Sequence, residues 1–169
     1  MTFHEDAMPL PTSLSRQLSI LLATCLPVLL TAHSLPRRVA EQEPDYLAQL
    51  LETAEAVADR AGLSPDQWTF CWQSAGHEPG EWMKPDFADL MPKIAAAGGR
   101  SVLVVPVQFL ADHLEILYDV DVGARDQAER CGLAFHRIQS LNLDRGLVEA
   151  LDAVARRTLP GTKGAGVNA

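Results

Sequence analysis

The stretch SVLVVPVQF, residues 101–109, is the most strongly apolar and β-branched run in the chain. It follows two glycines at 98–99 and leads into a charged segment, ADHLEILYDVD, at 111–121. An apolar run of this length, bounded by turn residues, is typical of a strand that is buried on both faces. Such strands occur in parallel sheets that helices cover on both sides. The run therefore predicts an α/β fold.

Three further apolar runs alternate with helical patterns on either side of this stretch. The predicted strands are 28–32, 68–73 and 134–141, and the predicted helices are 12–25, 45–62, 85–97, 112–131 and 144–157. Gly62 and Gly132 are placed to end two of these helices, and Pro85 is placed to open another. Strands separated by helices predict parallel βαβ units with right-handed crossovers, and hence a four-stranded parallel sheet.

Length and composition restrict the class of protein. The 169 residues suffice for one domain with a sizeable core. The net charge of −8 argues against binding to nucleic acid or anionic membranes, because both need basic patches. The longest apolar run, 18–30, is too short to span a bilayer and contains Pro27. The widely spaced Cys25, Cys71 and Cys131 predict neither disulfides nor structural zinc, which favours a reducing, cytoplasmic setting.

Polar residues follow three of the predicted strands. His33 follows the first strand, Gln73 and Ser74 follow the second, and the segment 111–121 follows the third. Ligands of open parallel sheets bind beyond the carboxyl ends of the strands, so we expect these loops to meet at one edge. A histidine at a strand end most often bonds to nearby backbone. His33 is therefore structural unless the other loops bring partners to it.

Glu115 and Asp119 are the candidate acids of this edge. Four residues apart on a helix, they lie on one face, where like charges repel by about 0.2–0.5 kcal/mol. A bound cation would reverse that cost. In the alternative interpretation, Asp112 and Glu115 form a helix N-cap with its N3 acid, and Asp119 is a solvated surface residue. His113 beside them is equally compatible with an ordinary surface histidine.

Two other features leave alternatives open. Trp82 lies in a Gly/Pro-rich loop after the second strand, where its ring is either a hydrophobic plug or a platform for a planar ligand. Ser34 adjoins His33, but adjacent residues rarely form a nucleophile–base pair. The sequence contains no GxSxG, GxxxxGK[ST] or GxGxxG motif, so neither a hydrolase nor a nucleotide-binding protein is indicated.

Four motifs in order, with similar spacing, resemble the C-terminal half of ferrochelatase. They are TAHSLPRRV (31–39), CWQSAGHEPGEWMKP (71–85), VLVVPVQFLADHLEILYDVDV (102–122) and FHRIQSLN (135–142). The resemblance covers residues 3–154, and its AHSLP and WQS are more similar to coproporphyrin-type bacterial enzymes. It implies a chelatase-like, flavodoxin- or Rossmann-like three-layer domain over 1–158, followed by a flexible tail at 159–169.

The ferrochelatase family inserts ferrous iron into a porphyrin, in a cleft between two similar α/β domains. The resemblance implies that His33 and Glu115 are the catalytic metal ligands or proton acceptors. It implies that Asp119, the next acid on the same face of the helix, is a further metal ligand. The residues that it places against the substrate are Ser34, Gln73, Ser74, Trp82 and His113.

Two departures from the family pattern bear on these expectations. Gly123 stands where the family's acidic ridge usually has a third carboxylate. The family's porphyrin pocket also uses an N-terminal half that we expect to be missing, so the implied partner is that half or a second copy. The implied substrates are Fe²⁺ and coproporphyrin III or protoporphyrin IX, with no tightly bound cofactor and no iron–sulfur cluster. The alternative from another class is a non-catalytic metal- or tetrapyrrole-binding domain.

Overall fold

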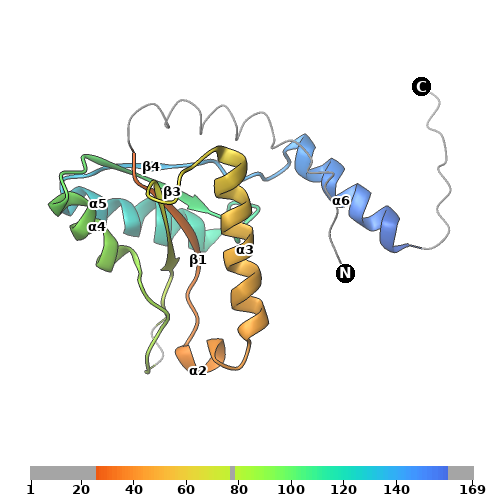
Figure 1. Ribbon diagram of the computed structural model, residues 1–169, viewed down its shortest axis with the longest axis horizontal. Helices are drawn as coiled ribbons and strands as arrows, with labels where there is room; N and C mark the ends of the chain where they lie inside the picture. Colours follow the sequence, from red (N-terminus) through yellow and green to blue (C-terminus); the bar gives the residue numbers. More distant parts are fainter. Residues whose placement is uncertain (1–25, 77–78, 160–169) are drawn as a thin grey trace.

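The computed structural model describes residues 26–76 and 79–159, which form an α/β domain around one parallel sheet (Figure 1). The sheet order is β2-β1-β3-β4, from the strands β1 (Val28–His33), β2 (Trp68–Gln73), β3 (Ser101–Pro106) and β4 (Ala134–Arg137). The predicted four-stranded parallel sheet is therefore confirmed. The predicted helix at 12–25 and nearly all of the predicted tail lie outside the described residues.

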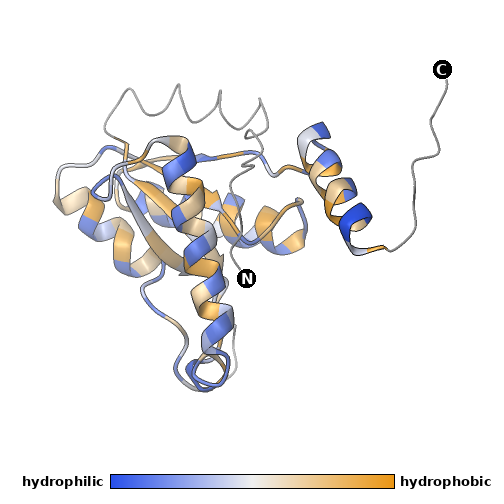
Figure 2. Cartoon of the chain, turned by 45° about the vertical axis from the view of Figure 1, so that its right-hand side comes forward, coloured by the Kyte–Doolittle hydropathy of each residue, from blue (hydrophilic) through white to orange (hydrophobic). Residues whose placement is uncertain are grey.

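Helices cover both faces of the sheet, which makes it the middle of three layers. The α-helices are α2 (Arg37–Ala40), α3 (Pro44–Ala61), α4 (Phe87–Ala96), α5 (Arg125–Arg130) and α6 (Arg145–Thr158), and η2 (Ile116–Ala124) is a π-helix. Helices α4, η2 and α5 pack on one face through Met91, Val120 and Ala128, among others. Helix α3 packs on the other face through Ala54 and Ala58. Figure 2 shows the hydrophobic strands behind an α3 that is striped with hydrophobic and hydrophilic residues.

Local signals end or begin two of the helices. Gly62 caps α3 in the left-handed conformation, with a φ of 71°, as the sequence predicted. Helix α4 begins after Asp86, which forms a reciprocal capping box with Asp89. Pro85, which was expected to open this helix, precedes its cap instead. No helix among residues 26–76 and 79–159 is long and apolar enough to cross a membrane.

The segment between β3 and α5 departs most from the prediction. The strand ends at Pro106 rather than at residue 109. The following helix begins at residue 114 rather than at 112, and it is π-helical over Ile116–Ala124. Asp112 does not cap this helix because its carboxylate accepts hydrogen bonds from the side chains of Ser140 and Asn142. Strand β4 also ends early, at Arg137 rather than at residue 141.

Helix α6 lies away from the sheet (Figure 1). None of its residues is buried, and Val148, Leu151 and Val154 are 51%, 56% and 59% exposed. Its charged residues pair along the helix itself, Arg145 with Glu149 and Arg156 with Asp152. The rest of the described chain therefore leaves the apolar side of α6 uncovered.

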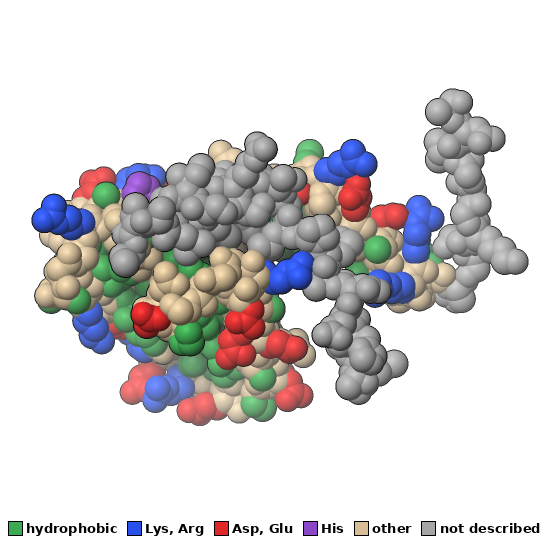
Figure 3. All heavy atoms as spheres, turned by 45° about the horizontal axis from the view of Figure 1, so that its top comes forward, with side chains coloured by type: hydrophobic (Ala, Val, Ile, Leu, Met, Phe, Trp, Pro, Cys, Tyr) green, Lys and Arg blue, Asp and Glu red, His purple; other side chains and the backbone are tan. Residues whose placement is uncertain are grey.

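Charge is distributed over the surface without a dominant basic region on the face that Figure 3 shows. Across the described residues visible there, acidic and basic side chains are interspersed, with no continuous basic patch.

Candidate functional site

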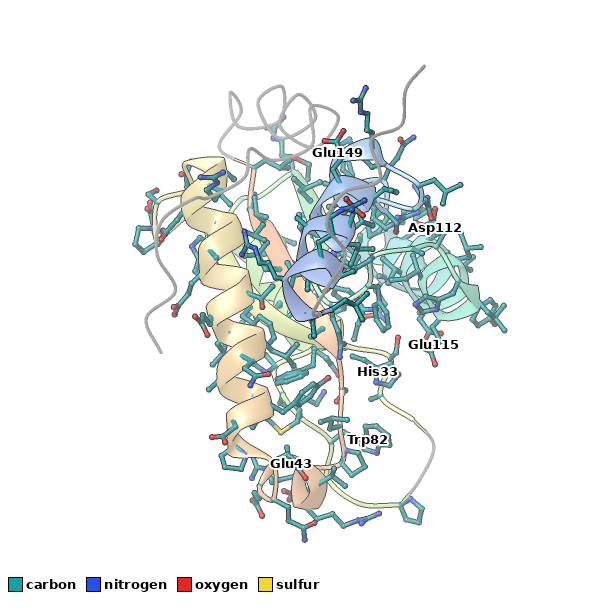
Figure 4. The ribbon with its side chains drawn as sticks, turned by 90° about the vertical axis from the view of Figure 1, so that its right-hand side faces the viewer. His33, Glu43, Trp82, Asp112, Glu115 and Glu149 are labelled. Carbon is teal, nitrogen blue, oxygen red and sulfur yellow. The ribbon has the colours of Figure 1, made fainter. Side chains whose placement is uncertain are left out.

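His33 and Glu115 face one another at the carboxyl edge of the sheet (Figure 4). His33 is the last residue of β1, and Glu115 directly precedes η2. Nε2 of His33 lies 3.7 Å from Oε2 of Glu115, and their side chains are 28% and 50% exposed. The loops after the first and third strands therefore meet at one edge, and both polar groups remain accessible to a ligand.

Hydrogen bonds to the backbone set the orientation of His33. Its Nδ1 lies 2.6 Å from the carbonyl oxygen of Ser34. Because a carbonyl oxygen only accepts, Nδ1 carries the proton, and Nε2 of the neutral ring keeps its lone pair on the side of Glu115. The backbone N–H of His33 donates to Oε1 of Gln108 over 2.7 Å. The strand end and its neighbour thus orient the ring so that Nε2, when it carries no proton, can bind a cation or accept a proton.

Phe109 lies between the two histidines of the site. Its ring centroid is 6.2 Å from that of His33 and 4.5 Å from that of His113, with edge-on geometry in both pairs. The ring of His113 is thus held against an aromatic wall next to the His33–Glu115 pair. Sequence reasoning missed Phe109 and Gln108 because both were included in the predicted strand at 101–109.

The structure contradicts the capping alternative for Glu115. No side chain caps the start of η2. The carboxylate of Asp112 instead accepts from Ser140 Oγ at 2.8 Å and from Asn142 Nδ2 at 3.1 Å. These bonds from Asn142 and Ser140, with a smaller contribution from Arg137, hold the pKa of Asp112 below its usual value. Asp112 therefore does not form the predicted cap with Glu115, although Glu115 still lies in the first turn of the helix that begins at residue 114, where an acid favours the helix dipole.

A hollow of about 470 Å³ lies between the end of β2, the start of α4 and η2. Gln73, Ser74, Asp119 and Gln127 are among the residues that line it. Gln73 is buried, and its Oε1 accepts from the hydroxyl of Thr31, but its Nε2 has no partner in the described chain. Ser74 Oγ and Gln127 Oε1 are likewise buried without a partner there. Such atoms cost about 1–3 kcal/mol each when left unpaired, so they favour the binding of water or of a polar ligand group in the hollow.

Asp119 and Gly123 follow Glu115 at intervals of four residues, and both line this hollow. A Cβ added at Gly123 would meet only the backbone oxygen of Tyr118, at an ordinary 3.7 Å. Space therefore does not explain why a carboxylate is missing at this position. Within residues 26–76 and 79–159, no three His, Cys, Asp or Glu side chains are grouped closely enough to hold a metal ion. A cation at His33 and Glu115 would need further ligands from water or a substrate.

Trp82 is held in place by the segment after β1 and by Gly76 in its own loop. Its backbone forms an antiparallel bridge with Pro36, after β1. Its indole packs on Gly76, where a Cβ would lie 2.8 Å from ring atom Cη2. Figure 4 shows Trp82 close to His33 on the same side of the molecule. Because the indole is only partly buried, it can present a flat surface to a ligand.

The ferrochelatase family model matches residues 14–159. The chain belongs to the ferrochelatase family. A ferrochelatase of Deinococcus radiodurans is 37% identical over 130 residues, which are 77% of this chain and 41% of that protein. A ferrochelatase of Herpetosiphon aurantiacus is 42% identical over 127 residues, which are 75% of this chain and 41% of that protein. A coproporphyrin III ferrochelatase of Geobacillus thermodenitrificans is 36% identical over 133 residues, which are 78% of this chain and 42% of that protein.

Membership of the ferrochelatase family confirms the resemblance inferred from the four motifs. The chain is homologous to ferrochelatases, lyases of heme biosynthesis for which Fe²⁺ is a substrate. It spans about two fifths of the length of the curated relatives that it matches.

Proposed function

We propose that this chain forms one wall of a ferrochelatase that inserts Fe²⁺ into a porphyrin, with His33 and Glu115 as the groups that handle metal and protons. The observation that carries the proposal is the 3.7 Å approach of these two side chains at the sheet edge of a ferrochelatase-family domain. Asp119 is the next acid along the same helix and extends the metal side of the site.

Metal insertion requires two pyrrole N–H protons to leave while the cation arrives. Nε2 of neutral His33 can bind Fe²⁺ or accept a proton. The carboxylate of Glu115 can accept the other proton or replace water around the cation. Each side chain is partly exposed, so the plane of a macrocycle can reach both.

The remaining candidates shape the porphyrin pocket. Trp82 provides a platform for one face of the macrocycle, and His113 extends the aromatic wall built on Phe109. Gln73 and Ser74, which line the hollow, contact the polar edge of the substrate. Ser34 is buried and its hydroxyl donates to the carbonyl of Met83, so it acts by positioning the loop beside His33. We infer coproporphyrin III rather than protoporphyrin IX as the substrate, because the AHSLP and WQS motifs and several relatives named coproporphyrin III ferrochelatases support it.

A porphyrin pocket needs a second wall, which we propose comes from an N-terminal ferrochelatase half or from a second copy. The short span relative to the curated relatives and the uncovered apolar side of α6 both support such a partner. At about 25 cal/mol per Å², leaving one face of the macrocycle in water loses roughly 5 kcal/mol for a face of about 200 Å². The chain alone should therefore bind porphyrin weakly and insert metal slowly or not at all.

The test is an iron-insertion assay combined with sedimentation mass, with and without an N-terminal ferrochelatase half added in trans. Iron insertion that appears only when the N-terminal half is added supports an enzyme built from two halves. A rate of insertion per chain that rises with the concentration of this chain alone supports a homodimer. The His33→Ala variant should stay folded by circular dichroism and lose insertion in either setting. Full turnover by a monomer contradicts the need for a second wall, and porphyrin binding without any insertion would favour a non-catalytic binding domain.

A further inference from the structure

Arg137, the last residue of β4, bonds to η2 and its leading loop on both sides of Glu115. Its Nε and Nη2 donate to the two carboxylate oxygens of Asp121, at 2.6 and 2.8 Å. Its Nη1 lies 3.3 Å from Oδ1 of Asp112. The Arg137 side chain is only 12% exposed, and bidentate arginine–carboxylate pairs are geometrically specific. One guanidinium group at the end of β4 therefore binds Asp112 before Glu115 and Asp121 after it.

The leading loop is also bonded to the segment after β4. The backbone N–H of Asp112 donates to Oδ1 of Asn142 at 2.9 Å, and Nδ2 of Asn142 donates back to Asp112. The backbone N–H of Asn142 donates to the carbonyl of Leu110 at 2.8 Å. Asn142 adopts a φ of 49°, a left-handed conformation that a non-glycine residue seldom takes. These contacts leave the loop little freedom to move relative to the sheet.

Glu115 itself contributes little to its own placement. Its side chain is half exposed, and its distance of 3.7 Å to His33 is longer than a hydrogen bond. Its position therefore depends on the backbone at the start of η2. A π-helix is rare and is frequently found at functional sites.

We propose that Arg137, acting through Asp112 and Asp121, is a positioning residue that holds Glu115 at its working distance from His33. This inference rests on the proposed function, because it assigns Arg137 a role in the same site. Hydrogen bonds to Asp121 raise the pKa of Arg137, and hydrogen bonds from Asn142 and Ser140 lower the pKa of Asp112.

The test is a titration of the full chain with Co²⁺, followed by its absorption, as a probe of the His33–Glu115 pair. R137Q should weaken Co²⁺ binding about tenfold, which is the lower end of the effect of losing an outer-shell contact. R145Q removes an exposed ion pair on α6 and serves as the matched control, with unchanged affinity. D121N removes the bidentate pair with an isosteric side chain, and it should reproduce the effect if R137Q does not fold.

A double variant separates positioning from general stabilisation. If Arg137 acts through Glu115, R137Q/E115Q should bind Co²⁺ no more weakly than E115Q alone. Lower thermal stability with unchanged Co²⁺ affinity in R137Q and D121N would overturn the positioning role and leave the proposed function standing. If the H33A and E115Q variants bind Co²⁺ as tightly as the wild-type chain does, the proposed function is overturned, and the positioning role with it.

Discussion

Nε2 of His33 and Oε2 of Glu115 lie 3.7 Å apart; His33 ends β1, and Glu115 lies in the segment that follows the neighbouring strand β3. Metal–nitrogen and metal–oxygen bonds to a divalent ion such as zinc are about 2.0–2.2 Å long, so both atoms can bind the same cation. The separation is too long for a direct hydrogen bond. The geometry therefore suits a pair that shares a metal or a proton with a substrate.

Glu115→Gln should abolish iron insertion by the assembled enzyme while changing the free energy of unfolding by less than about 0.5 kcal/mol, because the side chain is half exposed and caps nothing. Urea unfolding and an insertion assay measure the two quantities. A large loss of stability with a normal rate per folded molecule would restore the structural interpretation of Glu115.

Gly76→Ala should displace the indole of Trp82, because the new Cβ would lie 2.8 Å from the ring. We expect porphyrin affinity to fall about tenfold, or about 1.4 kcal/mol, as in W82F. Porphyrin quenching of tryptophan fluorescence measures this, with W82F identifying the signal of Trp82. Normal affinity in both variants would show that Trp82 is a plug rather than a platform.

Asp112→Asn should destabilise the fold by about 1 kcal/mol at pH 7, since it weakens hydrogen bonds to a charged, partly exposed carboxylate. A carboxyl group with a lowered folded pKa stabilises the fold above its unfolded pKa and stops doing so as the pH falls through the folded value. The difference from wild type should therefore shrink below about pH 4. Urea unfolding at pH 7 and pH 3 measures it, with Asp152→Asn on α6 as an exposed control. If the two proteins differ as much in free energy of unfolding at pH 3 as at pH 7, the charge of Asp112 is not the source of its stabilising effect.

Gly123→Glu should be tolerated and should strengthen cation binding in the hollow beside Asp119. A Cβ at this position makes only an ordinary contact with the backbone oxygen of Tyr118, and replacing a helical glycine stabilises a helix by about 0.5–1 kcal/mol. Thermal unfolding and Co²⁺ titration measure the two effects, with Gly123→Gln as the uncharged control. Equal Co²⁺ affinity in the Glu and Gln variants would show that a third carboxylate adds nothing here.

Much of the fold follows from local sequence signals. The apolar runs predicted all four strands, and the bounds of β2 at Trp68–Gln73 agree with the predicted 68–73. Gly62 marked the end of α3. These features were predictable because burial on both faces and left-handed turns each require particular residue types at particular spacings. The four motifs likewise indicated the family from the sequence alone.

The site geometry was decided by contacts between residues far apart in the chain. Asp112 has the sequence pattern of a helix cap, but hydrogen bonds from Ser140 and Asn142 occupy its carboxylate, and the helix begins later and becomes π-helical. Strand β4 ends at Arg137, whose guanidinium pairs with Asp121 on η2. Local sequence sets which secondary structures are favourable, whereas the free energy of such long-range polar contacts exists only once the sheet brings them together. The 3.7 Å approach of His33 and Glu115 is therefore a property of the tertiary structure alone.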